Sequence, residues 1–368
     1  MEVLERLHGA GQSLWMNHVA REQIYNGSLM QHIEDGAITG LSLSPLAVCH
    51  TMNSSPVYDD GIINKLGKGL YGESLAVDLI LDDLHHAADL LRHVFDRTAG
   101  VDGWAALPVS PLLTSDPDIL LQSVSALHTQ LKRKNTLITV PGLPDMSGAI
   151  EEIVFAGIPI IISLIYSCDQ YLNAAEAYLR GIERRITAGL KPAVSAFISI
   201  PIFHLATALS KEMKQQAANE ASIAIAGKIY KKMRTLHTSR QWERAYNAGV
   251  RPLRLIWASL DDEPAAAFDI SLYDQLVAPF TVAAMSEQAM GAFIKHGKPG
   301  ALLPADSDDC KEIQADHQKF SFKHLAGSLQ DEAAERKVKT WITLLDAVAR
   351  KSAVVMQSEP AIMSRGEN

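Results

Sequence analysis

The chain has 368 residues, of which 47% are hydrophobic and 21% charged, and its formal net charge is −8. This composition is typical of a folded globular protein with a sizeable core. The acidic balance argues against broad contact with a nucleic-acid backbone, because such contact requires clustered Lys and Arg.

The first residues, MEVLERLHGAGQ, are polar and helical and do not resemble a signal peptide. The longest apolar run, GIPIIISLIY, is shorter than the roughly 20 residues that a helix needs to cross a bilayer. Three widely spaced cysteines without a CxxC pattern (Cys49, Cys168 and Cys310) indicate neither a disulfide framework nor a zinc site. We therefore expect a cytoplasmic protein with no membrane segment and no nucleic-acid partner.

Short apolar segments bounded by turn residues recur along the chain between longer stretches of helical periodicity. This alternation predicts repeated strand-helix units with a parallel sheet that is buried on both faces. The eight predicted strands are residues 12–18, 38–44, 103–109, 135–141, 159–165, 195–202, 252–259 and 280–285.

The segments between these strands have helical patterns. In residues 167–189, Ser167 and Gln170 have the spacing of a capping box and Gly189 closes the end. Similar patterns occupy residues 76–98, 118–132 and 209–235, whereas residues 53–72 form a long polar connection. Such a connection is either a functional loop or a packed surface excursion.

Eight strands with intervening helices predict a closed α/β barrel of one domain, residues 1–350, followed by an irregular tail, residues 351–368. The alternative, an open doubly wound sheet, is disfavoured because no G-x-G-x-x-G pattern follows a strand.

Several segments together resemble the transaldolase family in its longer bacterial form. They include GAGQSLWMNHVAREQIYNGSLMQHIEDGAITGL near the N-terminus, LIYSCDQYLNAAEAYLRGIERR at the fifth strand, and GVRPLRLIWAS and SLYDQLVAPFTVAAM near the last two strands. The resemblance runs from about Leu7 to Asp346. It implies a (β/α)8 TIM barrel of transaldolase type.

The resemblance also implies a lysine on the fourth strand that forms a Schiff base with a ketose phosphate, in a segment that reads approximately I-K-I-P-A-T. The corresponding segment here begins Ile138, Thr139, Val140 and Pro141, so threonine takes the place of the lysine. A hydroxyl group cannot form an imine. None of the eight predicted strands contains a lysine, so we do not expect another lysine to replace it.

Other positions that match the family's polar site residues are neutral in this chain. The resemblance aligns Asn17 with an aspartate, Ser44 with an asparagine and Ser163 with a threonine. It aligns Pro108 with a glutamate, Ile161 with an asparagine and Ile202 with a phosphate-binding arginine. We expect an apolar pocket lined by Pro108, Ile161, Ile202, Trp257, Leu260, Ala283 and Met285.

The candidate catalytic residues are Asn17, Ser44, Thr139, Ser163 and His204. His204 lies just past the sixth strand and is either a group that moves a proton or a hydrogen-bonded histidine at a helix start. His18, at the end of the first strand, is either a general base or orienting group, or a histidine at the surface or in contact with a helix.

Asp261, Asp262 and Glu263 follow the seventh strand, at the end of a barrel where chemistry occurs. Clustered carboxylates of this kind either hold Mg²⁺ or form a solvated acidic loop. No other cofactor is expected.

We expect an enzyme that has lost the transaldolase site and serves specialised metabolism by acting on a largely apolar small molecule. The reaction would be a cyclisation, an isomerisation or an elimination, with a Mg²⁺-dependent prenyl diphosphate reaction as one form. Two alternatives stay open: a non-catalytic scaffold, and a transaldolase that uses an unrecognised lysine. The sequence does not predict an oligomeric state.

Overall fold

The computed structural model describes residues 2–114, 116–260, 270–303 and 322–363. Eight parallel strands form a closed barrel in which each strand pairs with the next in sequence, and β8 pairs with β1. The strands are β1 (Gln12–Val19), β2 (Gly40–Leu43), β3 (Trp104–Pro108), β4 (Thr136–Pro141), β5 (Ile160–Ser163), β6 (Ala196–Pro201), β7 (Arg254–Ala258) and β8 (Thr281–Met285).

All eight predicted strands are present, each within the predicted range or one residue beyond it, and the predicted (β/α)8 barrel is confirmed. The strands were recognisable because helices cover the outer face of a parallel barrel and side chains fill its interior. Both faces are then apolar, and each strand reads as a continuous apolar run.

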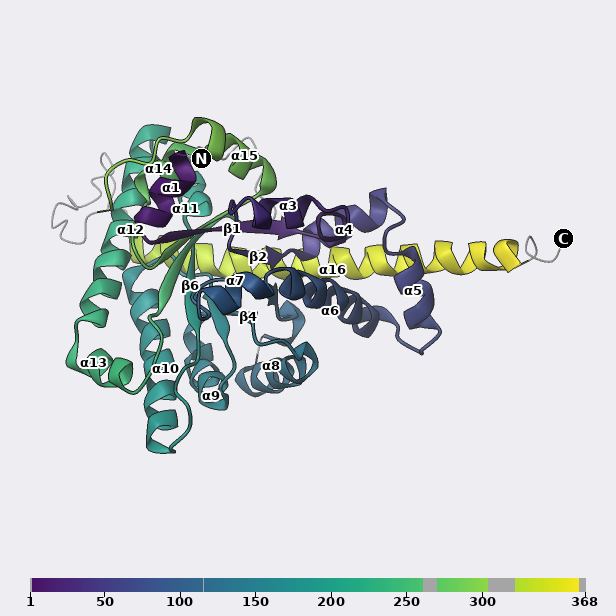
Figure 1. Ribbon diagram of the computed structural model, residues 1–368, viewed down its shortest axis with the longest axis horizontal. Helices are drawn as coiled ribbons and strands as arrows, with labels where there is room; N and C mark the ends of the chain where they lie inside the picture. The colour runs from purple at the N-terminus through teal and green to yellow at the C-terminus, as the bar shows by residue number, and fades with distance from the viewer. Residues whose placement is uncertain (1, 115, 261–269, 304–321, 364–368) are drawn as a thin grey trace.

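Helices surround the strands (Figure 1). They are α1 (Glu2–Gly9), α2 (Arg21–Tyr25), α3 (Ser28–Glu34), α4 (Pro45–Ser54), α5 (Asp59–Leu66), α6 (Gly72–Leu90), α7 (Arg92–Arg97), α8 (Pro117–Leu131), α9 (Ser147–Ala156), α10 (Cys168–Thr187), α11 (Ile202–Leu209), α12 (Gln215–His237), α13 (Arg240–Asn247), α14 (Ile270–Gln275), α15 (Glu287–His296) and α16 (Phe322–Met363). Two single 3₁₀ turns, η1 (Pro111–Leu113) and η2 (Pro144–Met146), follow β3 and β4.

Two segments that the sequence analysis left without a helix contain one. The polar connection 53–72 contains the helix α5, whose amphipathic pattern is too short to stand out between Gly and Ser residues. At the C-terminal end, α16 continues to Met363, so the chain does not become irregular at residue 351.

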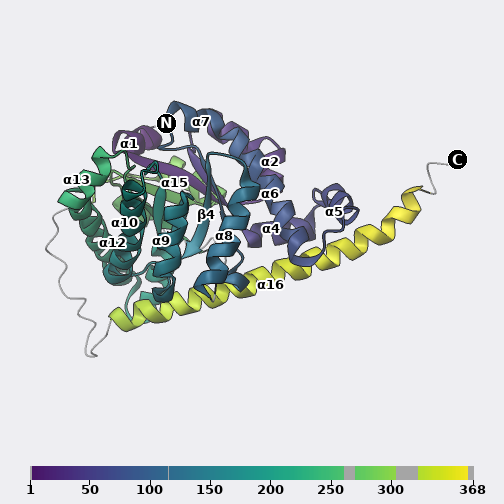
Figure 2. The ribbon, with the colours of Figure 1, turned by 90° about the horizontal axis from the view of Figure 1, so that it is seen from below.

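The long helix α16 crosses the end of the barrel at which the carboxyl ends of the strands lie, which we call the barrel mouth. It packs on α4, α5, α6 and η1. Figure 2 shows α16 running across this end of the barrel and projecting past α5 at its C-terminal end. The helix therefore covers the face where barrels carry their chemistry.

The barrel interior is filled by large side chains rather than left open. The rings of Trp15 and Phe197 are 5.0 Å apart between centroids, and those of Trp104 and Phe197 are 6.3 Å apart. Gly40 permits this packing, since a Cβ there would lie 2.5 Å from the Trp15 indole nitrogen. In the part of the chain that the structure describes, no helix is long and apolar enough to cross a membrane.

Candidate active site

A cavity of about 80 Å³ lies at the barrel mouth, between the ends of the strands and α16. Trp15 and Ile256 form part of its floor, and both belong to the apolar interior of the barrel. Six of the twelve other lining residues that the structure describes supply hydroxyl or amide groups. These come from Asn17, Ser42, Thr139, Ser163, Ser199 and Ser259.

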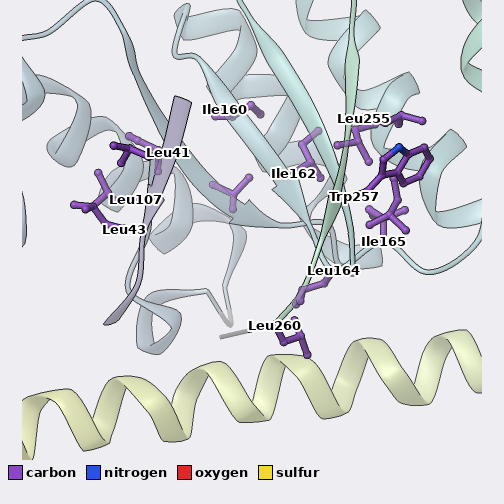
Figure 3. Packing of buried hydrophobic residues seen from close by; sticks show 14 of the residues in the cluster. Leu41, Leu43, Leu107, Ile160, Ile162, Leu164, Ile165, Leu255, Trp257 and Leu260 are labelled. Carbon is purple, nitrogen blue, oxygen red and sulfur yellow. The ribbon is translucent and has the colours of Figure 1, made fainter. Parts of the chain in front are cut away.

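Five of the predicted site residues do lie around this mouth cavity. Asn17, Thr139 and Ser163 contribute polar groups, and Ile161 and Leu260 contribute apolar ones. Leu260 lies between the end of β7 and α16 (Figure 3).

Two predicted catalytic residues lie elsewhere. Ser44 is 1% exposed and caps α4, where its hydroxyl accepts a hydrogen bond from the Ala47 amide at 3.2 Å. His204 is 4% exposed within α11, and its Nδ1 lies 2.8 Å from the hydroxyl of Tyr166. Neither residue lines the mouth cavity, and His204 has the environment of a buried structural histidine.

Four predicted pocket residues face outward. Ile202, Trp257, Ala283 and Met285 belong to the core layer between the strands and the surrounding helices. Figure 3 shows Trp257 pointing away from the barrel interior together with Leu255. In β7 the inward-facing residues are Ile256 and Ala258, and in β8 they are Val282 and Ala284.

His18 and Ser259 form a hydrogen-bonded pair at the mouth. Nε2 of His18 lies 3.2 Å from Oγ of Ser259, which lines the cavity. The register of β1 against β2 shifts between Met16 and Val19, and His18 has a φ of 61° within that irregularity. The local distortion turns His18 towards β7, where it can exchange a proton with the serine hydroxyl.

Lys337 of α16 also lines the mouth cavity. No hydrogen bond or ion pair of its ammonium group occurs within the described residues. The sequence alone did not indicate this lysine, because it lies in a helix and far along the chain from the predicted strands. The signal that would have found it is the C-terminal helix, which the family resemblance already included up to Asp346.

Two further cavities lie beyond the mouth cavity, one next to it and the second next to the first. A bridging cavity of about 40 Å³ shares Leu260 and Lys337 with it. A lateral cavity of about 430 Å³ lies between α6, α8, η1 and α16 and shares Pro108, Val109 and Trp341 with the bridging cavity. The predicted pocket residue Pro108 therefore lines these two cavities and not the mouth cavity itself.

A cavity of about 480 Å³ lies at the opposite end of the barrel, around the amino ends of the strands. The ion pair between Arg254 and Asp102, at 3.1 Å, forms part of its wall. Barrel enzymes place their chemistry at the carboxyl ends of the strands, so the mouth remains the candidate active site.

The predicted metal ligands Asp261, Asp262 and Glu263 lie outside the described residues. Within the described ranges, no group of three or more His, Cys, Asp or Glu side chains is arranged to hold a metal ion.

Comparison with known proteins agrees with the barrel fold. The sequence matches the family described as Transaldolase/Fructose-6-phosphate aldolase over residues 14–348. A protein named transaldolase from Thermobifida fusca is 28% identical over 366 residues, which cover 95% of this chain and 98% of that protein. Transaldolase 1 of Streptomyces avermitilis is 28% identical over 363 residues, with 95% of each chain covered. Transaldolase 2 of Nostoc punctiforme is 26% identical over 315 residues, which cover 80% of this chain and 82% of that protein. With most of its length matched by that family, the chain belongs to the transaldolase/fructose-6-phosphate aldolase family.

Proposed function

We propose that this protein is an enzyme that has lost the imine chemistry of transaldolases and acts on a less polar substrate. The lining of the mouth cavity carries this proposal. On β4, Thr139 occupies the position that the family resemblance assigns to the Schiff-base lysine. Lys337 is the one charged residue among the described residues that line the cavity. Among the described residues, a phosphate group placed there would lack the several cationic partners that offset its desolvation.

The His18 and Ser259 pair supports catalysis over a purely structural role. A histidine within 3.2 Å of a serine hydroxyl at the edge of a covered cavity can take up and return a proton. Proton transfer of this kind is sufficient for an isomerisation, an elimination or a cyclisation. Such a reaction on an apolar small molecule fits a role in specialised metabolism.

The first test is native mass spectrometry of the protein purified gently from its own host, followed by identification of any retained small molecule after denaturation. An apolar metabolite supports the proposal and supplies a compound for turnover assays. A retained sugar phosphate contradicts it. An empty protein favours the alternative, a non-catalytic barrel kept for its outer surface.

A second candidate function follows from Lys337, which places one amine at the mouth cavity. If this amine reacts with a ketose carbonyl, the protein is a transaldolase with a relocated lysine. Borohydride reduction in the presence of fructose 6-phosphate would then leave a covalent adduct that maps to Lys337. We expect no adduct, and the Lys337→Met variant serves as the blank for the mass measurement.

A further inference from the structure

We propose that the mouth, bridging and lateral cavities together bind one elongated molecule that has an apolar body and a carboxylate at one end. The carboxylate would lie at Lys337 in the mouth cavity, and the apolar body would lie in the lateral cavity. This inference rests on the proposed function and names the substrate class of the same site.

The three cavities lie in series and share lining residues. Lys337 and Leu260 line both the mouth and the bridging cavity, and Trp341 lines both the bridging and the lateral cavity. Lys337 and Trp341 are four residues apart and so lie on one face of α16. A molecule along this face would pass from the mouth to the space between α6 and α8.

The lateral cavity suits an apolar body. Its walls include Val77, Ile80, Leu107, Leu113 and Leu127. Its volume of about 430 Å³ falls within the roughly 300–1,000 Å³ that small-molecule pockets occupy in proteins.

Charge sets the orientation of the ligand. Glu73 and Asp78 line the lateral cavity, whereas Lys337 and Arg336 line the bridging cavity next to the mouth. Asp78 is paired with Lys65, and Arg336 is paired with Glu332 at 2.8 Å. Lys337 has no such partner within the described ranges, so an anionic group would be drawn towards the mouth.

The mouth carries polar groups that a ligand could contact. The side chains of Asn17, Thr139 and Ser199 line the cavity, are partly exposed and form no hydrogen bond to any described residue. Their donors and acceptors are therefore available to a polar group of a bound molecule. The mouth cavity, at about 80 Å³, is much smaller than the lateral cavity, so a compact anionic head such as a carboxylate suits it.

The test is isothermal titration calorimetry of the full-length protein with dodecanoate below its micelle concentration. The comparison ligands are dodecan-1-ol, which lacks the charge, and dodecyl phosphate, which has a larger anionic head. We expect saturable one-to-one binding of dodecanoate, and weaker binding of both comparison ligands.

Two variants with matched controls locate the ligand. Lys337→Met should weaken dodecanoate binding at least about tenfold, since it removes a charge-assisted contact. It should leave dodecan-1-ol unaffected. Lys339→Met changes a 76% exposed lysine of the same helix and should leave both affinities unchanged. Ala126→Trp should fill the lateral cavity from the exposed side of α8 and abolish binding of both ligands, whereas Gln122→Trp, on the same helix but outside the cavity, should not.

Failure of dodecanoate to bind, or an unchanged affinity in Lys337→Met, overturns the inference. Tighter binding of dodecyl phosphate than of dodecanoate overturns the carboxylate assignment. Failure of the proposed function has a different signature. It would be shown by a covalent borohydride adduct with fructose 6-phosphate. Lys337 and Ala126 are not buried, so their substitution should be tolerated. Thermal unfolding of each variant verifies that it folds. If Lys337→Met does not fold, Lys337→Gln takes its place.

Discussion

The side-chain amide of Gln330 donates a hydrogen bond to the carbonyl oxygen of Leu164 at 2.8 Å, and so joins α16 to the end of β5. The same nitrogen donates to the carbonyl oxygen of Gly142, just past β4, at 3.0 Å. Gln330 is 3% exposed and also accepts a hydrogen bond from Gln170. About two turns further along the helix, Lys337 reaches the mouth cavity, so this contact helps to position it.

Gln330→Leu should lower the free energy of unfolding by about 2–4 kcal/mol. The substitution leaves two buried carbonyl oxygens without donors, and each such group costs about 1–3 kcal/mol. Urea denaturation followed by circular dichroism measures the difference. The exposed neighbour is the control, since Asp331→Leu should change stability by less than about 0.5 kcal/mol. Equal stability of the two variants would show that Gln330 does not hold the helix.

Trp341→Ala should lower the free energy of unfolding by about 3–5 kcal/mol, because Trp341 is 2% exposed and its removal leaves a large void. The indole nitrogen also donates to Oε1 of Glu73 at 2.9 Å, and that bond would be lost. Ile342→Ala, at a side chain that is 46% exposed, should cost less than about 0.5 kcal/mol in the same denaturation experiment. A small effect at Trp341 would mean that α16 packs loosely on α6.

The strands could be predicted from the sequence because burial on both faces gives each strand an apolar signature. The same feature hid which side chains face inward. In β7, for example, Ile256 and Trp257 are both buried and apolar, and only Ile256 faces the barrel interior. Periodicity distinguishes the two faces of a strand only when one of them is polar.

Polar residues at the strand ends were placed better than apolar ones. Asn17, Thr139 and Ser163 do line the mouth cavity, because a polar side chain in an apolar strand is tolerated mainly where the strand meets a cavity or solvent. Ser44 is the exception, since a serine that precedes Pro45 at a helix start is used as a cap.

The contribution of α16 could not be predicted from local patterns. Gln330 and Gly142 are 188 positions apart in the sequence, and their contact depends on the path of the whole chain. Lys337 enters the site by the same long-range packing. The direction of the His18 side chain could not be predicted either, because it depends on an irregularity of β1 that the regular alternation of side chains does not reveal.

Asp83→Asn should lower the free energy of unfolding by about 3–5 kcal/mol at pH 7.5. Asp83 is fully buried and accepts hydrogen bonds from Arg21 Nε at 2.6 Å and from the Tyr58 hydroxyl at 2.7 Å. Burial raises the pKa of Asp83 to about 6, and the Arg21 charge opposes that change, so the carboxylate is ionised at pH 7.5. Asparagine would leave the buried Arg21 guanidinium with only its longer ion pair to the exposed Asp82, at 3.9 Å.

The adjacent carboxylate is a matched control for this pair. Asp82 is 46% exposed and lies 2.8 Å from Lys65, so Asp82→Asn should cost no more than about 1 kcal/mol. Chemical denaturation of the two variants at the same pH gives the comparison. A loss at Asp83 no greater than that at Asp82 would contradict the role of the buried pair in joining α2 to α6.

His237 should make the protein less stable as the pH falls from 6.5 towards 4. Burial, assisted by the charge of Arg234, lowers the pKa of His237 from 6.5 to about 4. Between these values the unfolded chain binds a proton that the folded chain does not, so stability is fully present above pH 6.5 and decreases below it. The difference between the two pKa values corresponds to about 3 kcal/mol of folding free energy. His237→Phe keeps a ring against Trp242, whose centroid lies 4.5 Å away, and removes the titrating group. Chemical denaturation at pH 7.5 and pH 4.5 measures how much unfolding free energy is lost on acidification. This loss should be about 2–3 kcal/mol smaller in the variant than in the wild type. An equal loss in both proteins would exclude His237 as its source.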